Sequence, residues 1–289
     1  MSEGIIDLHT HSRYSDGSMT PTELVNHAKA SGIAAIALSD HDSVGGVREA
    51  MAAGERVGVE VIPAIELSVI SATETHILGY FIDPDSPAIA LAMEKILATR
   101  RHRSEETCRL LNELGFPVTM EEAEELAGGE MLCRAHFARL LQNKGLVSSV
   151  KEAFDKYLAN GRPANCNIQA ITDQEAIRLI HAAGGIAFVA HLHLIRLSDE
   201  ELFTYLSGLK EAGLDGIEGY YTEYTPKMQE NFQGMARTLG LQISGGTDFH
   251  AAMKPHIAIG RGLGNLSIPY SVLEKMKKYY NTKKEGTRK

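Results

Sequence analysis

The chain has 289 residues, 44% of them hydrophobic, and its 29 Lys and Arg against 37 Asp and Glu give a formal net charge of −8. No run approaches the ~20 apolar residues of a membrane span, and the negative charge disfavours long duplex nucleic acid while leaving room for a small anionic substrate in a local basic pocket. The chain has only 3 cysteines, without CxxC spacing, and no signal-peptide pattern, so we predict a cytoplasmic protein. The unusual feature of the composition is its 12 histidines.

Short apolar runs recur along the chain, and runs of this kind are typical of buried parallel strands. In chain order they span residues 5–8, 33–38, 59–67, 76–81, 185–189, 214–217 and 241–243. Capping boxes predict helices that begin after Thr20, Thr172 and Ser198, and Gly32 and Gly184 stand where helices would end. This alternation of strands and helices predicts an α/β fold with a parallel sheet or barrel.

Between residues 88 and 160 the pattern is helical, with almost no strand signal. We therefore expect a helical insertion domain over 88–160 between two parts of one barrel, residues 1–87 and 161–289. The turn-like sequence Asn160-Gly161-Arg162-Pro163 marks its far boundary. The polar, basic tail 282–289 is expected to fray.

Residue types that bind metals gather just after the predicted strands. His9 and His11, like Asp248 and His250, are two positions apart, so the side chains of each pair point the same way on an extended chain. In barrels of βα units, catalytic residues lie at the carboxyl ends of the strands. Several of the predicted strands present such residues at that end, whereas Glu66 lies within a run, His76 opens its own strand and Asp16 lies in the first loop. The nine candidate ligands are His9, His11, Asp16, His41, Glu66, His76, His191, Asp248 and His250.

Nine ligands are too many for one ion, and they predict a site for two or three divalent ions. Mixed imidazole and carboxylate ligands suit Mn, Zn or Fe. Such ions polarise phosphoryl oxygens and generate hydroxide at neutral pH. A single histidine such as His76 is more often an ordinary polar residue with its hydrogen bonds satisfied, so the prediction rests on the joint placement of these residues.

These residues resemble the motifs of the PHP (polymerase and histidinol phosphatase) superfamily of metal-dependent phosphoesterases. The matching segments are Asp7-Leu8-His9-Thr10-His11, Ser39-Asp40-His41-Asp42, Ala190-His191 and Thr247-Asp248-Phe249-His250. The resemblance covers essentially the whole chain and implies a distorted (β/α)7 TIM-like barrel with a small helical insertion. It also implies a metal site with three ligand groups: His9, His11, Glu66 and Asp248 around one ion; His76 and His191, with Glu66 as a bridge, around a second; and Asp16, His41 and His250 around a third.

Within the family, the chain is similar to phosphoesterases that act on nucleoside 3′,5′-bisphosphates, such as adenosine 3′,5′-bisphosphate, and on the 5′ ends of short oligonucleotides. The likeness rests on residues 12–17 and 133–139. A substrate with two phosphates needs cations for the phosphate that the ions do not hold, and Arg can bind phosphate in a bidentate manner. We expect substrate contacts from Arg13, Arg134, His136 and Arg162.

The resemblance implies a mechanism in which a metal-bound hydroxide attacks phosphorus. His193 or a metal-bound water would protonate the leaving oxygen. Two departures from the family pattern bear on these expectations. Leu192 replaces the usual proline after His191, so the loop loses a fixed φ. A Lys-Pro-Ala-Tyr-like segment is replaced by Gly161-Arg162-Pro163-Ala164-Asn165, which keeps a cation and lacks the aromatic residue.

Two other functions stay open at this point. One is a histidinol-phosphate phosphatase, whose substrate would need fewer cations than Arg134 and His136 provide. The other is a non-catalytic PHP module that supports a polymerase; such modules often lack ligands, whereas all nine positions carry suitable residues here.

Overall fold

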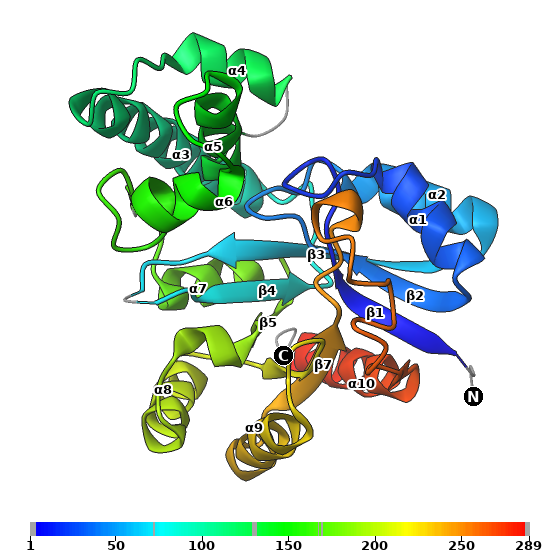
Figure 1. Cartoon of the computed structure of the whole chain (residues 1–289). Coiled ribbons are helices and arrows are strands. Elements are labelled where there is room, and N and C mark those ends of the chain that lie inside the picture. The colour runs from blue at the N-terminus through cyan, green and yellow to red at the C-terminus, as the bar shows by residue number, and fades with distance from the viewer. Residues whose placement is uncertain (1–3, 72, 129–131, 167, 169, 287–289) are drawn as a thin grey trace. The chain divides into compact units, whose positions relative to one another are not determined.

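The computed structural model describes residues 4–71, 73–128, 132–166, 168 and 170–286 (Figure 1). The chain divides into two compact units, residues 1–93 with 171–289 and residues 94–170. That segment 88–160 forms a separate insertion domain stays a prediction.

The first unit is a barrel whose strands follow the order β7-β6-β5-β4-β3-β2-β1-β8 in the described part of the chain. The strands are β1 (Ile5–Thr10), β2 (Ile33–Leu38), β3 (Glu60–Ser68), β4 (His76–Tyr80), β5 (Ile186–Val189), β6 (Gly216–Tyr221), β7 (Gln242–Gly246) and β8 (Ile268–Pro269). Each predicted run contains one of the first seven strands or overlaps it. The short β8 is an addition that pairs antiparallel with β1.

The barrel closes where β7 approaches β1. A Cβ on Gly246 would lie 2.4 Å from the backbone nitrogen of His9, so this close approach requires glycine. The buried carboxylate of Asp7 in β1 accepts hydrogen bonds from the backbone and hydroxyl of Thr247 and from the backbone N–H of Gly260. These bonds tie the chain beyond β7 to β1, and the predicted distorted barrel is confirmed.

Strand β4 runs antiparallel to both of its neighbours, β3 and β5, so the prediction of a parallel strand at 76–81 is wrong. Only residues 69–75 connect β3 to β4. That connection is too short for the crossover of about a dozen residues that a parallel pair needs. The reversal places the first residue of β4 at the barrel end where β1, β2 and β3 finish.

The helices of this unit are α1 (Pro21–Ala30), α2 (Val47–Val57), α7 (Asp173–Ala182), α8 (Asp199–Glu211), α9 (Pro226–Leu239) and α10 (Ser271–Gly286), with short 3-10 turns at Leu192–Ile195 and Ala251–Met253. The capping boxes at Thr20, Thr172 and Ser198 are confirmed. Gly32 and Gly184 follow α1 and α7 with positive φ. Helix α10 is ordered through Gly286, so the fraying predicted for 282–286 is wrong; residues 287–289 lie outside the described residues.

Side chains alternate along β2 between the inside of the barrel and its helical cover. Ala35 and Ala37 join the cluster inside the barrel, whereas Ile36 and Leu38 pack with residues of α1 and α2. Helix α10 contributes apolar side chains to the inner cluster. The barrel is therefore a packed core that holds its strand ends in fixed positions.

The second unit is helical. It contains the later part of α3 (Pro87–Glu113), then α4 (Met120–Ala127), α5 (Arg134–Asn143), α6 (Val150–Ala153) and the π-helical turn Phe154–Leu158. Leu111, Phe137 and Leu141 are fully or almost fully buried in a core of its own. In the described parts of the chain, no helix is long and apolar enough to cross a membrane.

Candidate metal centre

The nine predicted metal ligands come together at one end of the barrel. His9 and Glu66 lie within β1 and β3. The other seven lie at strand ends or in the loops that follow: His11, Asp16, His41, His76, His191, Asp248 and His250. Because β4 is antiparallel, His76 at its start reaches the same end as the residues that follow the parallel strands.

The first group of ligands surrounds one oxygen of Glu66 and one of Asp248. His11 Nε2 lies 3.1 Å from Asp248 Oδ1 and 3.3 Å from Glu66 Oε2, and His9 Nε2 lies 3.2 Å from the same Glu66 oxygen. One ligand atom from each of the four buried residues lies within 4.8 Å of the others. Together they can surround one ion.

Glu66 turns its second oxygen toward a second group. Its Oε1 lies 2.9 Å from His76 Nδ1 and 3.0 Å from His191 Nε2, and these two nitrogens are 3.2 Å apart. His41 Nδ1 lies 3.1 Å from the first oxygen, Oε2. A carboxylate whose two oxygens face different sets of imidazoles has the arrangement needed to bridge two ions.

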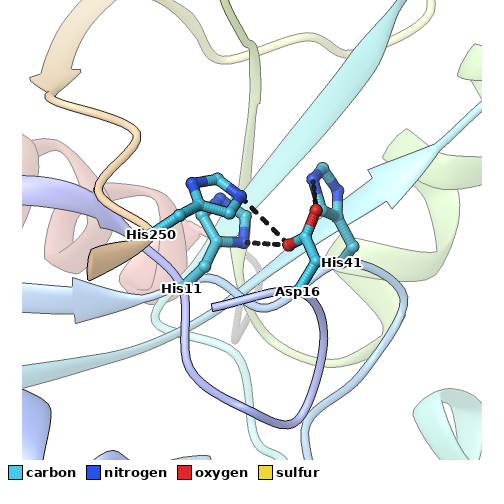
Figure 2. A group of neighbouring side chains, drawn as sticks. All are labelled: His11, Asp16, His41 and His250. Atoms are coloured by element: carbon cyan, nitrogen blue, oxygen red, sulfur yellow. Dashed lines mark ion pairs between the residues drawn. The ribbon is translucent and has the colours of Figure 1, made fainter. Parts of the chain in front are cut away.

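Asp16 connects the third group, as Figure 2 shows. Its Oδ1 lies 3.0 Å from His250 Nε2 and 3.9 Å from His11 Nδ1, and its Oδ2 lies 4.0 Å from His41 Nε2. The Asp16 side chain is 43% exposed, so this group borders solvent. His11 faces both the first and the third group, but a neutral imidazole has one lone pair and can bind only one ion.

The packing of these groups changes their proton affinities. Burial alone would raise the pKa of Glu66, but the charges of His41 and His9 beside it hold this pKa well below its usual range. Burial, followed by the charges of His250 and His41, lowers the pKa of His11 to about 3. Glu66 is therefore ionised and His11 is neutral at pH 7, which are the protonation states that metal binding requires.

The donor set fits divalent cations. His11 Nε2, Asp16 Oδ1 and His41 Nδ1 are buried, and although each lies 3.0–3.1 Å from an atom of another ligand, none of them forms a hydrogen bond among the described residues. Burying unpartnered polar atoms costs free energy, so such atoms in a native structure call for an explanation. Cations between these imidazole and carboxylate groups would satisfy them, and the ligand types suit Zn, Mn or Fe.

Glu218 in β6 was not among the predicted site residues, although it supports two of the ligands. Its Oε1 accepts a hydrogen bond from His9 Nδ1 at 2.9 Å, and its Oε2 accepts one from the backbone N–H of His191 at 2.8 Å. Because a carboxylate can only accept, Nδ1 of His9 carries the proton and Nε2 faces Glu66. The available signal was a single acidic residue in a buried apolar strand.

Asp40 fixes the loop that carries Asp16. Its buried carboxylate accepts hydrogen bonds from the backbone and hydroxyl of Ser12 and from Ser15 Oγ, each at 2.7 Å. Since the Ser15 hydroxyl proton goes to Asp40, His11 Nδ1 donates to Ser15 Oγ at 3.4 Å. His11 Nε2 is then the nitrogen that can bind an ion.

The backbone at His191 has a positive φ of 23°, which non-glycine residues rarely adopt. After it, the backbone N–H of Leu192 donates to Tyr224 Oη at 2.7 Å, and this hydroxyl donates to the backbone oxygen of Glu218. Proline has no N–H to donate. With leucine in place of the usual proline after His191, residue 192 keeps its backbone N–H, and Tyr224 accepts a hydrogen bond from it.

The second oxygen of Asp248 points away from the first ligand group. Oδ2 accepts hydrogen bonds from Tyr221 Oη at 3.0 Å and from Lys254 Nζ at 2.6 Å. Neither Tyr221 nor Lys254 was predicted, because only their three-dimensional placement connects them with the metal motifs.

Two further predicted residues lie in the same unit. Arg13 is exposed on the loop that carries Asp16. His193 Nε2 lies 3.0 Å from Glu223 Oε2, and its Nδ1 is buried without a hydrogen-bond partner in the described part of the chain.

The other predicted substrate contacts lie in the second unit. Arg134 Nη1 donates to the backbone oxygen of Leu158 and to the side-chain oxygens of Asn160 and Asn165. His136 Nδ1 accepts a hydrogen bond from the backbone N–H at the start of α5. Arg162 is exposed. Their roles toward a substrate stay predictions.

The chain is similar in sequence and fold to known proteins. The PHP domain model matches residues 7–257. A 5′-3′ exoribonuclease of Haemophilus influenzae is 36% identical over 245 residues, which cover 84% of this chain and 89% of that protein. A 3′,5′-nucleoside bisphosphate phosphatase of Chromobacterium violaceum is 36% identical over 248 residues, covering 85% and 87%. A structure from Bifidobacterium adolescentis, assigned as a metal-dependent phosphoesterase, matches with a TM-score of 0.81 at 25% identity, covering 94% of each chain.

Proposed function

The chain belongs to the PHP domain family and is a phosphoric ester hydrolase, and we propose that it acts on nucleoside 3′,5′-bisphosphates, on the 5′ ends of short oligonucleotides, or on both. The observation that carries this proposal is the convergence of nine imidazole and carboxylate side chains, Glu66 among them, at one end of the barrel. The names of the two relatives at 36% identity support both substrate classes.

Two or three divalent ions, Mn, Zn or Fe, would be held by the three ligand groups described above. When bound, such ions polarise a phosphoryl oxygen and provide a hydroxide nucleophile at neutral pH. The chain's own contribution is to fix the ligands. Glu66 joins two groups, Glu218 sets the proton of His9, and Asp40 holds the loop of Asp16.

The second phosphate of the substrate, which the metal ions would not hold, needs cationic side chains of the protein. Arg13 is suited to this because it is exposed on the same loop as Asp16, and guanidinium binds phosphate in a bidentate manner. Arg134, His136 and Arg162 stay predicted contacts. His193 stays the predicted proton donor to the leaving oxygen, with Glu223 orienting its ring.

The proposal is tested by a substrate panel with the Mn²⁺-reconstituted chain. Adenosine 3′,5′-bisphosphate should release inorganic phosphate, and short 5′-phosphorylated oligoribonucleotides should release mononucleotides. A matched sample treated with chelator should be inactive. Absence of turnover on both substrates would refute the substrate assignment.

The same panel separates the alternatives. Faster turnover of histidinol phosphate than of the bisphosphate would favour a histidinol-phosphate phosphatase. Less than one metal ion per chain, together with no activity on any substrate, would favour a non-catalytic module. A cytoplasmic location also stays a prediction.

A further inference from the structure

Lys254 lies beside the metal centre, although no motif includes it. It follows the 3-10 turn Ala251–Met253, and its backbone is fixed because its N–H donates to the oxygen of Ala251 and its own oxygen accepts from Ile257. Its Nζ lies 2.6 Å from Asp248 Oδ2. The side chain is 39% exposed, whereas that of Asp248 is 9% exposed, so the ammonium stands on the solvent side of the carboxylate.

The two oxygens of Asp248 have different neighbours. Oδ1 faces the histidines, with His11 Nε2 at 3.1 Å, and this is the oxygen that belongs to the first ligand group. Oδ2 faces Lys254 and the buried hydroxyl of Tyr221. The ammonium therefore does not occupy the place of an ion between Asp248 Oδ1 and the imidazoles.

Lys254 is not required to orient Asp248. Tyr221 Oη donates to the same carboxylate oxygen at 3.0 Å, and the Tyr221 side chain is held in the core. Among the described residues, Asp248 is the only hydrogen-bond partner of Lys254 Nζ. An ammonium has three N–H donors, so two are left for a ligand that enters from the solvent side.

The charges around the site when it holds metal ions indicate that the ligand of Lys254 is an anion. Two divalent ions would balance the carboxylates of Asp16, Glu66 and Asp248 in the ligand groups together with that of Glu218 beside His9. Lys254 adds a further positive charge at the rim, where an approaching phosphate would meet both the ions and the ammonium. Lys carries a compact charge on a flexible stem, which allows it to follow a phosphoryl oxygen.

We propose that Lys254 is a substrate-binding residue that donates hydrogen bonds to an oxygen of the phosphate held at the ions. This inference rests on the proposed function, because it assigns the phosphate to the same site. It differs from a positioning role, in which Lys254 would act only through Asp248.

The test is binding of inorganic phosphate to the Mn²⁺-loaded full chain, measured by calorimetry with the metal content of each sample determined. Lys254→Met should weaken phosphate binding about tenfold or more, because it removes a charge-assisted hydrogen bond. Lys254→Arg should retain affinity within about threefold, since it keeps the charge. The matched control Lys275→Met, at an exposed position of α10, should bind phosphate as the wild type does.

Three results would overturn the inference: wild-type protein that binds no phosphate, Lys254→Met protein that binds it within about twofold of wild type, or a loss of metal in Lys254→Met that accounts for the weaker binding. The last result would make Lys254 a positioning residue. If phosphate binding depends on Lys254 while no phosphoester is hydrolysed, the inference stands and the proposed function fails.

Discussion

Replacing Glu218 by Gln perturbs the ligands without touching any atom that faces an ion. The two carboxylate oxygens accept from His9 Nδ1 at 2.9 Å and from the backbone N–H of His191 at 2.8 Å, in a fully buried position. Gln has the same shape but one acceptor oxygen. One of the two donors would therefore face the amide NH₂ group and lose its acceptor.

The magnitude follows from these two contacts. A buried donor left without an acceptor costs about 1–3 kcal/mol. Loss of the carboxylate also makes the ligand nitrogen of His9 less basic, and removal of a group that orients a metal-bound histidine typically weakens metal binding about 10- to 100-fold. We therefore expect Glu218→Gln to weaken Mn²⁺ binding about 10- to 100-fold, which is roughly 1.4–2.7 kcal/mol.

The assay is a titration of the metal-free chain with Mn²⁺, monitored by calorimetry. Glu230→Gln, an exposed position on α9, is the matched control and should bind Mn²⁺ as the wild type does. If Glu218→Gln binds Mn²⁺ within about twofold of wild type, then Glu218 does not determine which ring nitrogen of His9 carries the proton. The assignment of the proton to Nδ1, with Nε2 left to bind an ion, would then be wrong.

Leu192→Pro should leave the metal content within about twofold of the wild type, because the ligand is the imidazole of the preceding residue. Loss of the hydrogen bond from the backbone N–H to Tyr224 should lower the free energy of unfolding by about 1 kcal/mol, measured by denaturant titration. A loss of most of the metal would contradict this prediction. Asp215→Asn should lower the free energy of unfolding by about 2–4 kcal/mol at pH 7, because the buried carboxylate accepts from His181 and pairs with Lys283. Burial would raise the pKa of Asp215, but His181 and Lys283 lower it below its usual value. Its contribution is thus present above about pH 4 and is lost as the pH falls further, so wild type and variant should converge in acid; a constant difference from pH 7 to pH 2 would refute this.

Much of the fold follows from the sequence because local signals agree with the final structure. Apolar runs located strands β1 to β7, and the capping boxes at Thr20, Thr172 and Ser198 located three helix starts. The direction of β4 was missed because its apolar pattern looks the same in either orientation. The length of segment 69–75, rather than its composition, decides the direction.

The site is predictable to the extent that its ligands follow strand ends. The i, i+2 pairs at His9 and Asp248 placed their partners on the same side of the chain, and the structure brings all nine candidates together. Glu218 and Lys254 were missed for a physical reason. One is a lone acid in a buried strand and the other lies in an ordinary loop, so only folding brings them to the ligands.

The central claim is that the three ligand groups form a metal centre with more than one ion, joined by Glu66. The most direct measurement is the metal content per chain after reconstitution with Mn²⁺ and removal of excess ions, for wild type and for Glu66→Ala. We expect two or three ions in the wild type and at least one fewer in Glu66→Ala, with loss of phosphoesterase activity. Fewer than two ions in the wild type, or full metal content and full activity in Glu66→Ala, would contradict this claim.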